Sequence, residues 1–157
     1  MGKLGDLFPK SEKQKYIGRQ LQPGQVLYLF SGFTSPPKEK FLVLACPGTK
    51  PLLFVINSKV HPFIANRPDL LRCQVKLSAS DYDFLDHDSF INCGEVIDYF
   101  ELKKVQEQVL ADVGRIRGEL NTVTKREIIR VVKGARTISK RHKKLIVNAL
   151  RRGLETT

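Results

Sequence analysis

Between residues 23 and 97 the chain consists of short apolar runs, and this pattern restricts its possible folds more than any other feature. Three runs, at 26–30, 41–46 and 52–56, end at Gly, Pro, Asn or Ser. Runs of this length between turn residues predict buried strands rather than helices. Residues 72–78 alternate apolar and polar side chains, and 89–97 contains another short run. The segment therefore predicts five or six short strands.

No stretch of helical length separates these runs, so the strands must pair as antiparallel neighbours in a small curved barrel or sandwich. After residue 99 the apolar spacing changes to the helical period, with Leu102, Val105 and Val109 on one stripe. A capping-box pattern at 124–127 and a capping Ser139 predict two further helices. The expected class is α+β, a small antiparallel β-barrel with a helical C-terminal extension. The expected parts are an N-terminal polar arm or short helix at 1–22, a barrel with a covering helix at 23–121, and a basic helical hairpin at 122–157.

Positive charge is concentrated in the predicted hairpin. Residues 123–152 hold eleven Lys or Arg and a single acid, Glu127, in a chain whose net charge is +11. A local field of this kind selects an anionic partner, and a phosphate backbone is the partner we favour. An acidic protein segment and a merely solvated helix face remain open. The candidate nucleic-acid contacts are Lys38, Lys125, Arg126, Arg130, Lys140, Arg141, Lys143 and Lys144.

The remaining composition predicts a cytoplasmic protein without a membrane segment. The three cysteines are widely spaced in apolar or alternating runs, which is typical of free thiols in a reducing compartment. The first fifteen residues are polar and lysine-rich rather than signal-like, and the longest apolar run is too short to cross a bilayer. No motif for a nucleotide cofactor is present, and no cofactor or metal is predicted.

Residues 81–89 hold four aspartates and one histidine. This set could bind a divalent ion, but the spacing matches no metal motif, and turn formation is the simpler interpretation. His87 lies between Asp86 and Asp88, and these carboxylates would stabilise its imidazolium. Such a histidine suits a general acid or a phosphate contact.

The order of elements is similar to a known family. The stretch Pro23-Gly-Gln-Val-Leu-Tyr-Leu-Phe30, a loop, Lys40-Phe-Leu-Val-Leu-Ala45 and Leu52-Leu-Phe-Val-Ile-Asn57 resembles the opening of the MazF/PemK-like toxins. The resemblance covers about residues 23–120. It implies an SH3-like barrel, a homodimer, and metal-independent cleavage of single-stranded RNA within a toxin–antitoxin or phage-defence module with an acidic antitoxin. Lys40 stands where that family has an Arg-Pro pair, and Asn57 or Ser58 stands at the position of its Thr or Ser.

The leading interpretation is an RNA-binding, toxin-type endoribonuclease. RNA cleavage without a metal needs a cation for the developing charge, together with a base and an acid. We assign charge stabilisation to Lys40, phosphate positioning to Ser58 and acid–base work to His87, with Asp86 or Asp88 orienting the imidazole. The alternatives are a non-catalytic nucleic-acid-binding module, a transcriptional regulator that reads DNA with the hairpin, and a barrel that binds an acidic protein.

Overall fold

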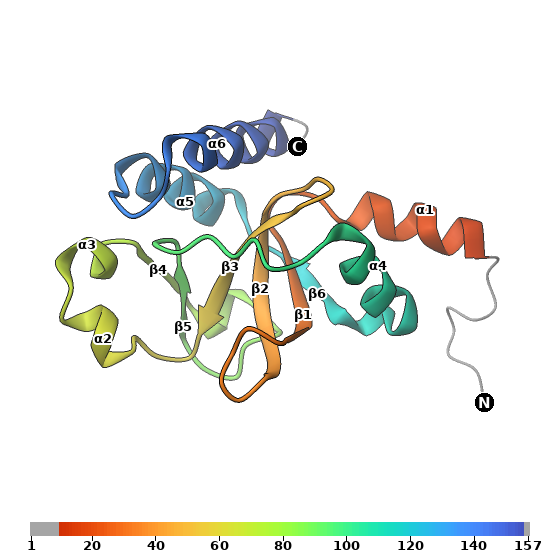
Figure 1. The fold of residues 1–157 in the computed structure, drawn as a ribbon, viewed down its shortest axis with the longest axis horizontal. Coiled ribbons are helices and arrows are strands. Elements are labelled where there is room, and N and C mark those ends of the chain that lie inside the picture. Colours follow the sequence, from red (N-terminus) through yellow and green to blue (C-terminus); the bar gives the residue numbers. More distant parts are fainter. Residues whose placement is uncertain (1–9, 156–157) are drawn as a thin grey trace.

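A computed structural model describes residues 10–155 and shows one six-stranded antiparallel sheet with helices on both faces (Figure 1). The strand order is β4-β5-β3-β2-β1-β6. The strands are β1 (Gln25–Ser31), β2 (Lys38–Cys46), β3 (Leu52–Asn57), β4 (Gln74–Leu77), β5 (Ser89–Asn92) and β6 (Ile116–Glu119). The helices are α1 (Lys10–Gln20), α2 (Pro62–Ala65), α3 (Pro68–Leu71), α4 (Leu102–Ala111), α5 (Thr122–Gly134) and α6 (Lys140–Glu155), with 3-10 turns η2 (Ala79–Asp81) and η3 (Val113–Arg115).

The α+β class, the curled antiparallel sheet and the helical C-terminus are confirmed. The expected N-terminal short helix corresponds to α1, while residues 1–9 lie outside the described part of the chain. Between β3 and β4 the chain forms the single-turn helices α2 and α3. Each begins with a proline, Pro62 or Pro68, whose fixed φ and missing N–H suit the first turn of a helix.

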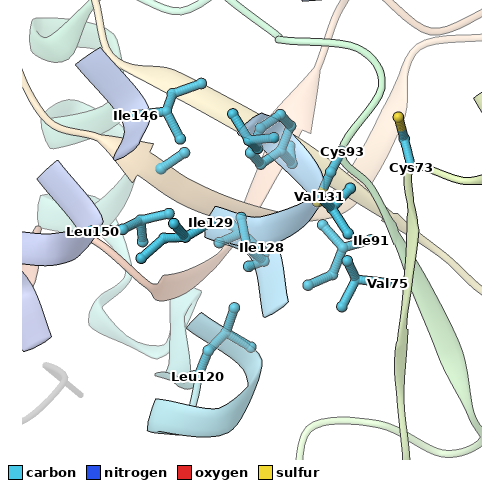
Figure 2. Packing of buried hydrophobic residues seen from close by; sticks show 14 of the residues in the cluster. Cys73, Val75, Ile91, Cys93, Leu120, Ile128, Ile129, Val131, Ile146 and Leu150 are labelled. Carbon is cyan, nitrogen blue, oxygen red and sulfur yellow. The ribbon is translucent and has the colours of Figure 1, made fainter. Parts of the chain in front are cut away.

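Helices cover the sheet on both faces. Because both faces are buried, the sequences of β1, β2 and β3 are nearly continuous apolar runs. On one face, α5 and α6 pack Ile128, Val132, Ile146 and Leu150 against strand residues that include Val75 (Figure 2). On the other face, α1 and α4 cover the alternate residues of the same strands. That second core includes Ile17, Leu27, Leu42, Val105 and Val109.

Side chains, rather than strand pairing, connect the two edges of the curled sheet. The edge strands β4 and β6 do not pair with each other within residues 10–155, so the sheet is a half-barrel. The connection from β4 to β5 crosses towards the end of β6, where the Tyr82 hydroxyl accepts a hydrogen bond from Asn121 N (3.1 Å) and shares one with Thr124 Oγ1 (2.8 Å). Phe84 follows and stacks on Phe41, with ring centroids 5.5 Å apart.

Local capping fixes where the two C-terminal helices begin. Asn121 is the N-cap of α5, and its Oδ1 accepts a hydrogen bond from Thr124 N at 2.8 Å. The predicted capping box at 124–127 therefore lies one turn too late, and Glu127 pairs with Arg130 instead. Ser139 caps α6 as predicted, because its Oγ accepts a hydrogen bond from His142 N.

Cys46, Cys73 and Cys93 are free thiols, and burial raises the pKa of Cys93 well above its usual value.

Of the helices within residues 10–155, none combines the length and apolarity needed to cross a membrane.

Replacing Tyr82 by Phe should lower the free energy of unfolding by about 1–2 kcal/mol, because one hydroxyl serves two partners at the closure of the half-barrel. Urea denaturation measures this change. Tyr16→Phe is the matched control, since Tyr16 is 43% exposed, and it should change stability by less than about 0.5 kcal/mol. Equal stability of the two variants would contradict the proposed role of Tyr82.

Candidate nucleic-acid interface

The outer side of α5, α6 and their connection carries the candidate interface. α6 buries Ile146, Val147, Ala149 and Leu150, so most of its remaining positions face solvent. α5 packs over β4 and α6 over β2, which places the two helices side by side on one face of the sheet (Figure 1). The exposed cations, which we call the basic surface, are Arg126, Lys133, Arg136, Lys140, Arg141, Lys144, Arg151 and Arg152.

The charge of the basic surface is not neutralised within the fold. None of its eight cations forms an ion pair with an acid in the part of the chain that the structure describes. Arg130 is also exposed but pairs with Glu127, and this hydrogen bonding lowers the pKa of Glu127. Because exposed pairs of this kind are weak, Arg130 can exchange its partner for another anion.

Lys125 was predicted to be a nucleic-acid contact, but it is buried and so does not belong to the basic surface. Its side chain is 4% exposed, and its Nζ lies 2.6 Å from Glu119 Oε1. The aliphatic stem of Lys125 passes close to Gly24. A β-carbon added to Gly24 would lie 2.4 Å from Lys125 Cε, so glycine leaves the space that the stem occupies. The sequence contained the signal, since Lys125 lies three residues before Ile128 on the buried stripe of α5.

Lys143 has a different position from its exposed neighbours. It is half-buried, and its Nζ donates a hydrogen bond to Lys133 O in the last turn of α5, at 3.2 Å. A cation there satisfies a terminal carbonyl and opposes the negative end of the helix dipole. Lys143 therefore stabilises the hairpin as well as adding to its charge.

Lys38 and Lys40 lie far from the helical hairpin, on the opposite face of the sheet. They line a cavity of about 320 Å³ together with Asn57 and Asn92. Lys40 Nζ donates to Asn57 Oδ1 at 3.0 Å, and desolvation, followed by repulsion from Lys38, lowers the pKa of Lys40. Of the two residues weighed for the strand end, Asn57 contacts Lys40, whereas Ser58 is exposed and does not line the cavity.

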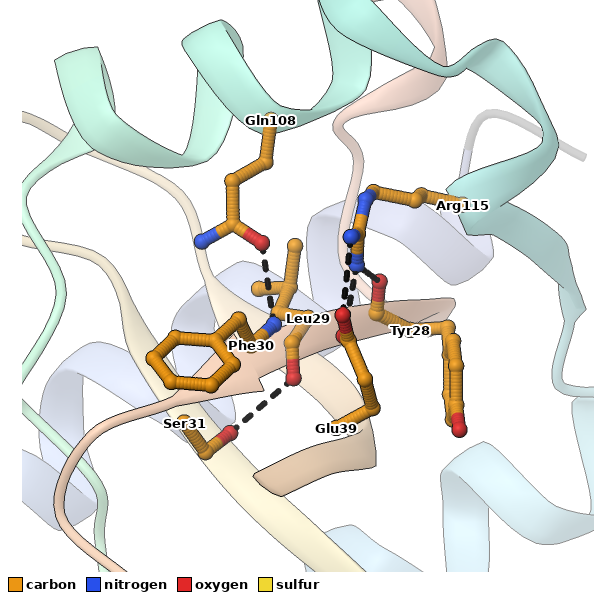
Figure 3. A network of polar contacts seen from close by, with 7 residues as sticks. All are labelled: Tyr28, Leu29, Phe30, Ser31, Glu39, Gln108 and Arg115. Carbon is orange, nitrogen blue, oxygen red and sulfur yellow. Dashed lines mark hydrogen bonds and ion pairs between the residues drawn. The ribbon is translucent and has the colours of Figure 1, made fainter. Parts of the chain in front are cut away.

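Glu39 stands between these lysines in sequence but points to the other face of β2. Arg115 holds it through two hydrogen bonds, Nη1 to Oε2 at 2.7 Å and Nη2 to Oε1 at 2.9 Å (Figure 3). Arg115 also donates to Tyr28 O, and its hydrogen bonds lower the pKa of Glu39. Glu39 is thus committed to Arg115 and does not neutralise Lys38 or Lys40.

The other candidate catalytic residues lie on the connection from β4 to β5. Asp86, His87 and Asp88 are exposed, and none of them lines the cavity beside Lys40. Asp88 accepts a hydrogen bond from Ala79 N (2.9 Å), which is the main cause of its lowered pKa, and it lies 3.5 Å from Lys76 Nζ. Asp88 therefore fixes the turn rather than serving as a dedicated partner of His87.

Metal binding finds no support in this turn. Among residues 10–155, no three His, Cys, Asp or Glu side chains are placed to hold an ion.

Asn92 and Glu95 also line the cavity, although the sequence did not indicate them as site residues. They become neighbours of Lys40 because β5 pairs with β3 in the register that sets Ile91 opposite Ile56. That register depends on long-range pairing, and no local pattern in 89–97 reveals it.

Comparison with protein-family models and with curated proteins gives no match for this chain. The curled sheet with its helices is consistent with a small barrel fold. The resemblance to the MazF/PemK-like toxins therefore stays an interpretation of residues 23–120.

Glu119→Gln should lower the free energy of unfolding by about 1–3 kcal/mol, because it leaves the buried ammonium of Lys125 without its countercharge. Glu127→Gln removes an exposed pair and should cost less than about 1 kcal/mol. Chemical denaturation of the two variants compares the pairs directly. A larger loss for Glu127→Gln would show that Lys125 is not held as described.

Proposed function

We propose that this protein binds RNA through the phosphate backbone, using the basic surface of α5 and α6. The observation that carries the proposal is the set of eight exposed cations that have no acidic partner within residues 10–155. Unopposed like charges on adjacent helices repel one another, and an anionic partner relieves that repulsion. Lysine and arginine that contact phosphates release counterions and so provide affinity.

The scaffold beneath these cations favours a preformed site. Ile146 and Leu150 anchor α6 in the core, so the helix presents its exposed face without further folding. From Lys140 to Arg152 the helix extends roughly 18 Å, which is enough to contact several successive phosphates. Asn148 is exposed between Lys144 and Arg151 and can donate further hydrogen bonds to the strand.

Base-specific reading of duplex DNA fits less well. α5 and α6 are consecutive helices in contact with each other (Figure 1), and a short connection followed by a basic second helix is common to many helical hairpins. Contacts from a basic face to phosphates position a strand without reading its sequence. An acidic protein partner would use the same charges, so a polyglutamate chain belongs in every binding experiment as a competing polyanion.

RNA cleavage is the second candidate function, and it rests on the half-buried Lys40 beside Asn57. Binding is favoured over cleavage because His87, the candidate acid and base, is outside that cavity. The cavity's own acid, Glu95, is exposed and is not within ion-pair distance of Lys40.

Changing Lys140, Arg141, Lys144 and Arg151 together to Gln should weaken binding of a single-stranded RNA by about tenfold or more at 0.1 M salt, because phosphate contacts are lost. The slope of log affinity against log salt should flatten by roughly 0.7 for each lost contact with a single strand. Fluorescence anisotropy with a labelled oligoribonucleotide measures both quantities.

The matched control removes the same number of charges elsewhere, by changing Lys15, Lys50, Lys103 and Lys104 to Gln. These exposed lysines lie outside the hairpin, and screening over about 10 Å limits their influence, so affinity should stay within about threefold. Equal losses in the two quadruple variants would contradict a local site. Equally tight binding of polyglutamate would favour an acidic protein partner instead.

Labelled RNA incubated with the protein in EDTA should remain at full length while it is bound, because the described residues do not bring His87 to Lys40. Denaturing gel electrophoresis over several hours checks this outcome. Cleavage that persists in EDTA and disappears in Lys40→Met would contradict the expectation and would assign phosphodiester chemistry to the Lys40 cavity.

A further inference from the structure

Lys40 lacks the kind of partner that other inward-facing cations have. Lys125 pairs with Glu119, and Arg115 pairs with Glu39. Lys40 is also half-buried, yet no carboxylate within residues 10–155 lies within ion-pair distance of its ammonium. Among those described residues, its hydrogen-bond acceptor is the neutral Asn57 Oδ1. Burying a charge without a countercharge is costly, so an anion at this position would stabilise the fold.

Lys38 makes this imbalance larger. It lies two residues from Lys40 on the same side of β2, and its charge adds to desolvation, the larger cause, in lowering the pKa of Lys40. Both lysines line the same cavity, so one small dianion could contact both. Asn57 adds to this donor set, because its amide nitrogen remains available when its oxygen accepts from Lys40.

The cavity offers room and apolar surface beside these donors. Its volume of about 320 Å³ lies at the lower end of the range of small-molecule sites. Phe33, Val55, Ile64 and Ile97 provide an apolar wall, and Phe33 is held in place by Tyr99 at 5.4 Å between ring centroids. The connection between β1 and β2, orange at the bottom of Figure 1, forms one side.

We propose that this cavity binds a nucleoside monophosphate group, with its phosphate on Lys38 and Lys40 and its base against the apolar wall around Phe33. The ligand combines a compact dianion with a flat aromatic ring whose faces can pack on apolar side chains, which matches the two halves of the cavity. A free nucleotide and the phosphorylated end of an RNA strand share this chemistry. The site lies on the opposite face of the sheet from the basic surface, so it does not depend on the function proposed for that surface.

Isothermal titration calorimetry of the whole chain tests the site with AMP, adenosine and inorganic phosphate. AMP should bind saturably, and adenosine and phosphate should each bind at least about tenfold more weakly, since each occupies only half of the cavity. Lys40→Met and Lys38→Gln should each weaken AMP binding by about fivefold or more. Lys38 is exposed, so its substitution keeps the test valid even where Lys40→Met disturbs folding.

Two controls separate this site from the basic surface. Lys104→Gln changes an exposed lysine on α4, and the quadruple Gln variant changes α6, and both should leave the AMP affinity within about twofold. In the quadruple variant, a 5′-phosphorylated hexaribonucleotide that binds more tightly than AMP would identify a strand end as the ligand source. Weaker binding than AMP would identify a free nucleotide.

The proposal is overturned by three outcomes. These are no saturable AMP binding up to about 10 mM, a weak limit by the usual affinity scale, an AMP affinity unaffected by both lysine variants, or equal affinity for inorganic phosphate. The second of these outcomes would place any bound nucleotide outside this cavity.

Discussion

Burial of both faces of one sheet is the constraint on which the rest of the structure depends. Leu27 and Leu42 point to the α1 and α4 side, while Val26 and Val43 point to the α5 and α6 side. The apolar stripe of α6 must therefore lie on the sheet, and its other positions have only solvent to face. The exposure of its cations follows from that packing.

The same constraint explains why Lys125 and Lys40 differ from the exposed cations of the basic surface. Lys125 occupies a position on the buried stripe of α5 and is tolerated there because Glu119 supplies a countercharge and Gly24 leaves space. Lys40 continues the apolar face of Leu42 and Leu44 beyond the cover of α1 and α4. Helix packing thus places Lys125 in a core, and the sheet places Lys40 at an open cavity. Lys125 has an acidic partner, whereas Lys40 has no carboxylate within ion-pair distance among residues 10–155.

Much of the fold could be predicted from local patterns, whereas the sites depended on long-range pairing. The strands β1, β2 and β3 and the cap at Ser139 follow from turn residues and spacing. The grouping of Lys40 with Asn57 depends on the β2–β3 register, and the separation of His87 from both depends on the closure by Tyr82. His87 and Lys40, which were assigned to one catalytic site, are therefore apart, whereas Lys40 and Asn57 are brought together although they are distant in sequence.

Backbone amide chemical shifts during titration of the ¹⁵N-labelled chain with a single-stranded oligoribonucleotide test the nucleic-acid proposal most directly. The largest shifts should fall on residues 136–152 and should fade as salt is raised. Shifts confined to other elements, or no shifts at low salt, would contradict the assignment of the basic surface as the RNA-binding face.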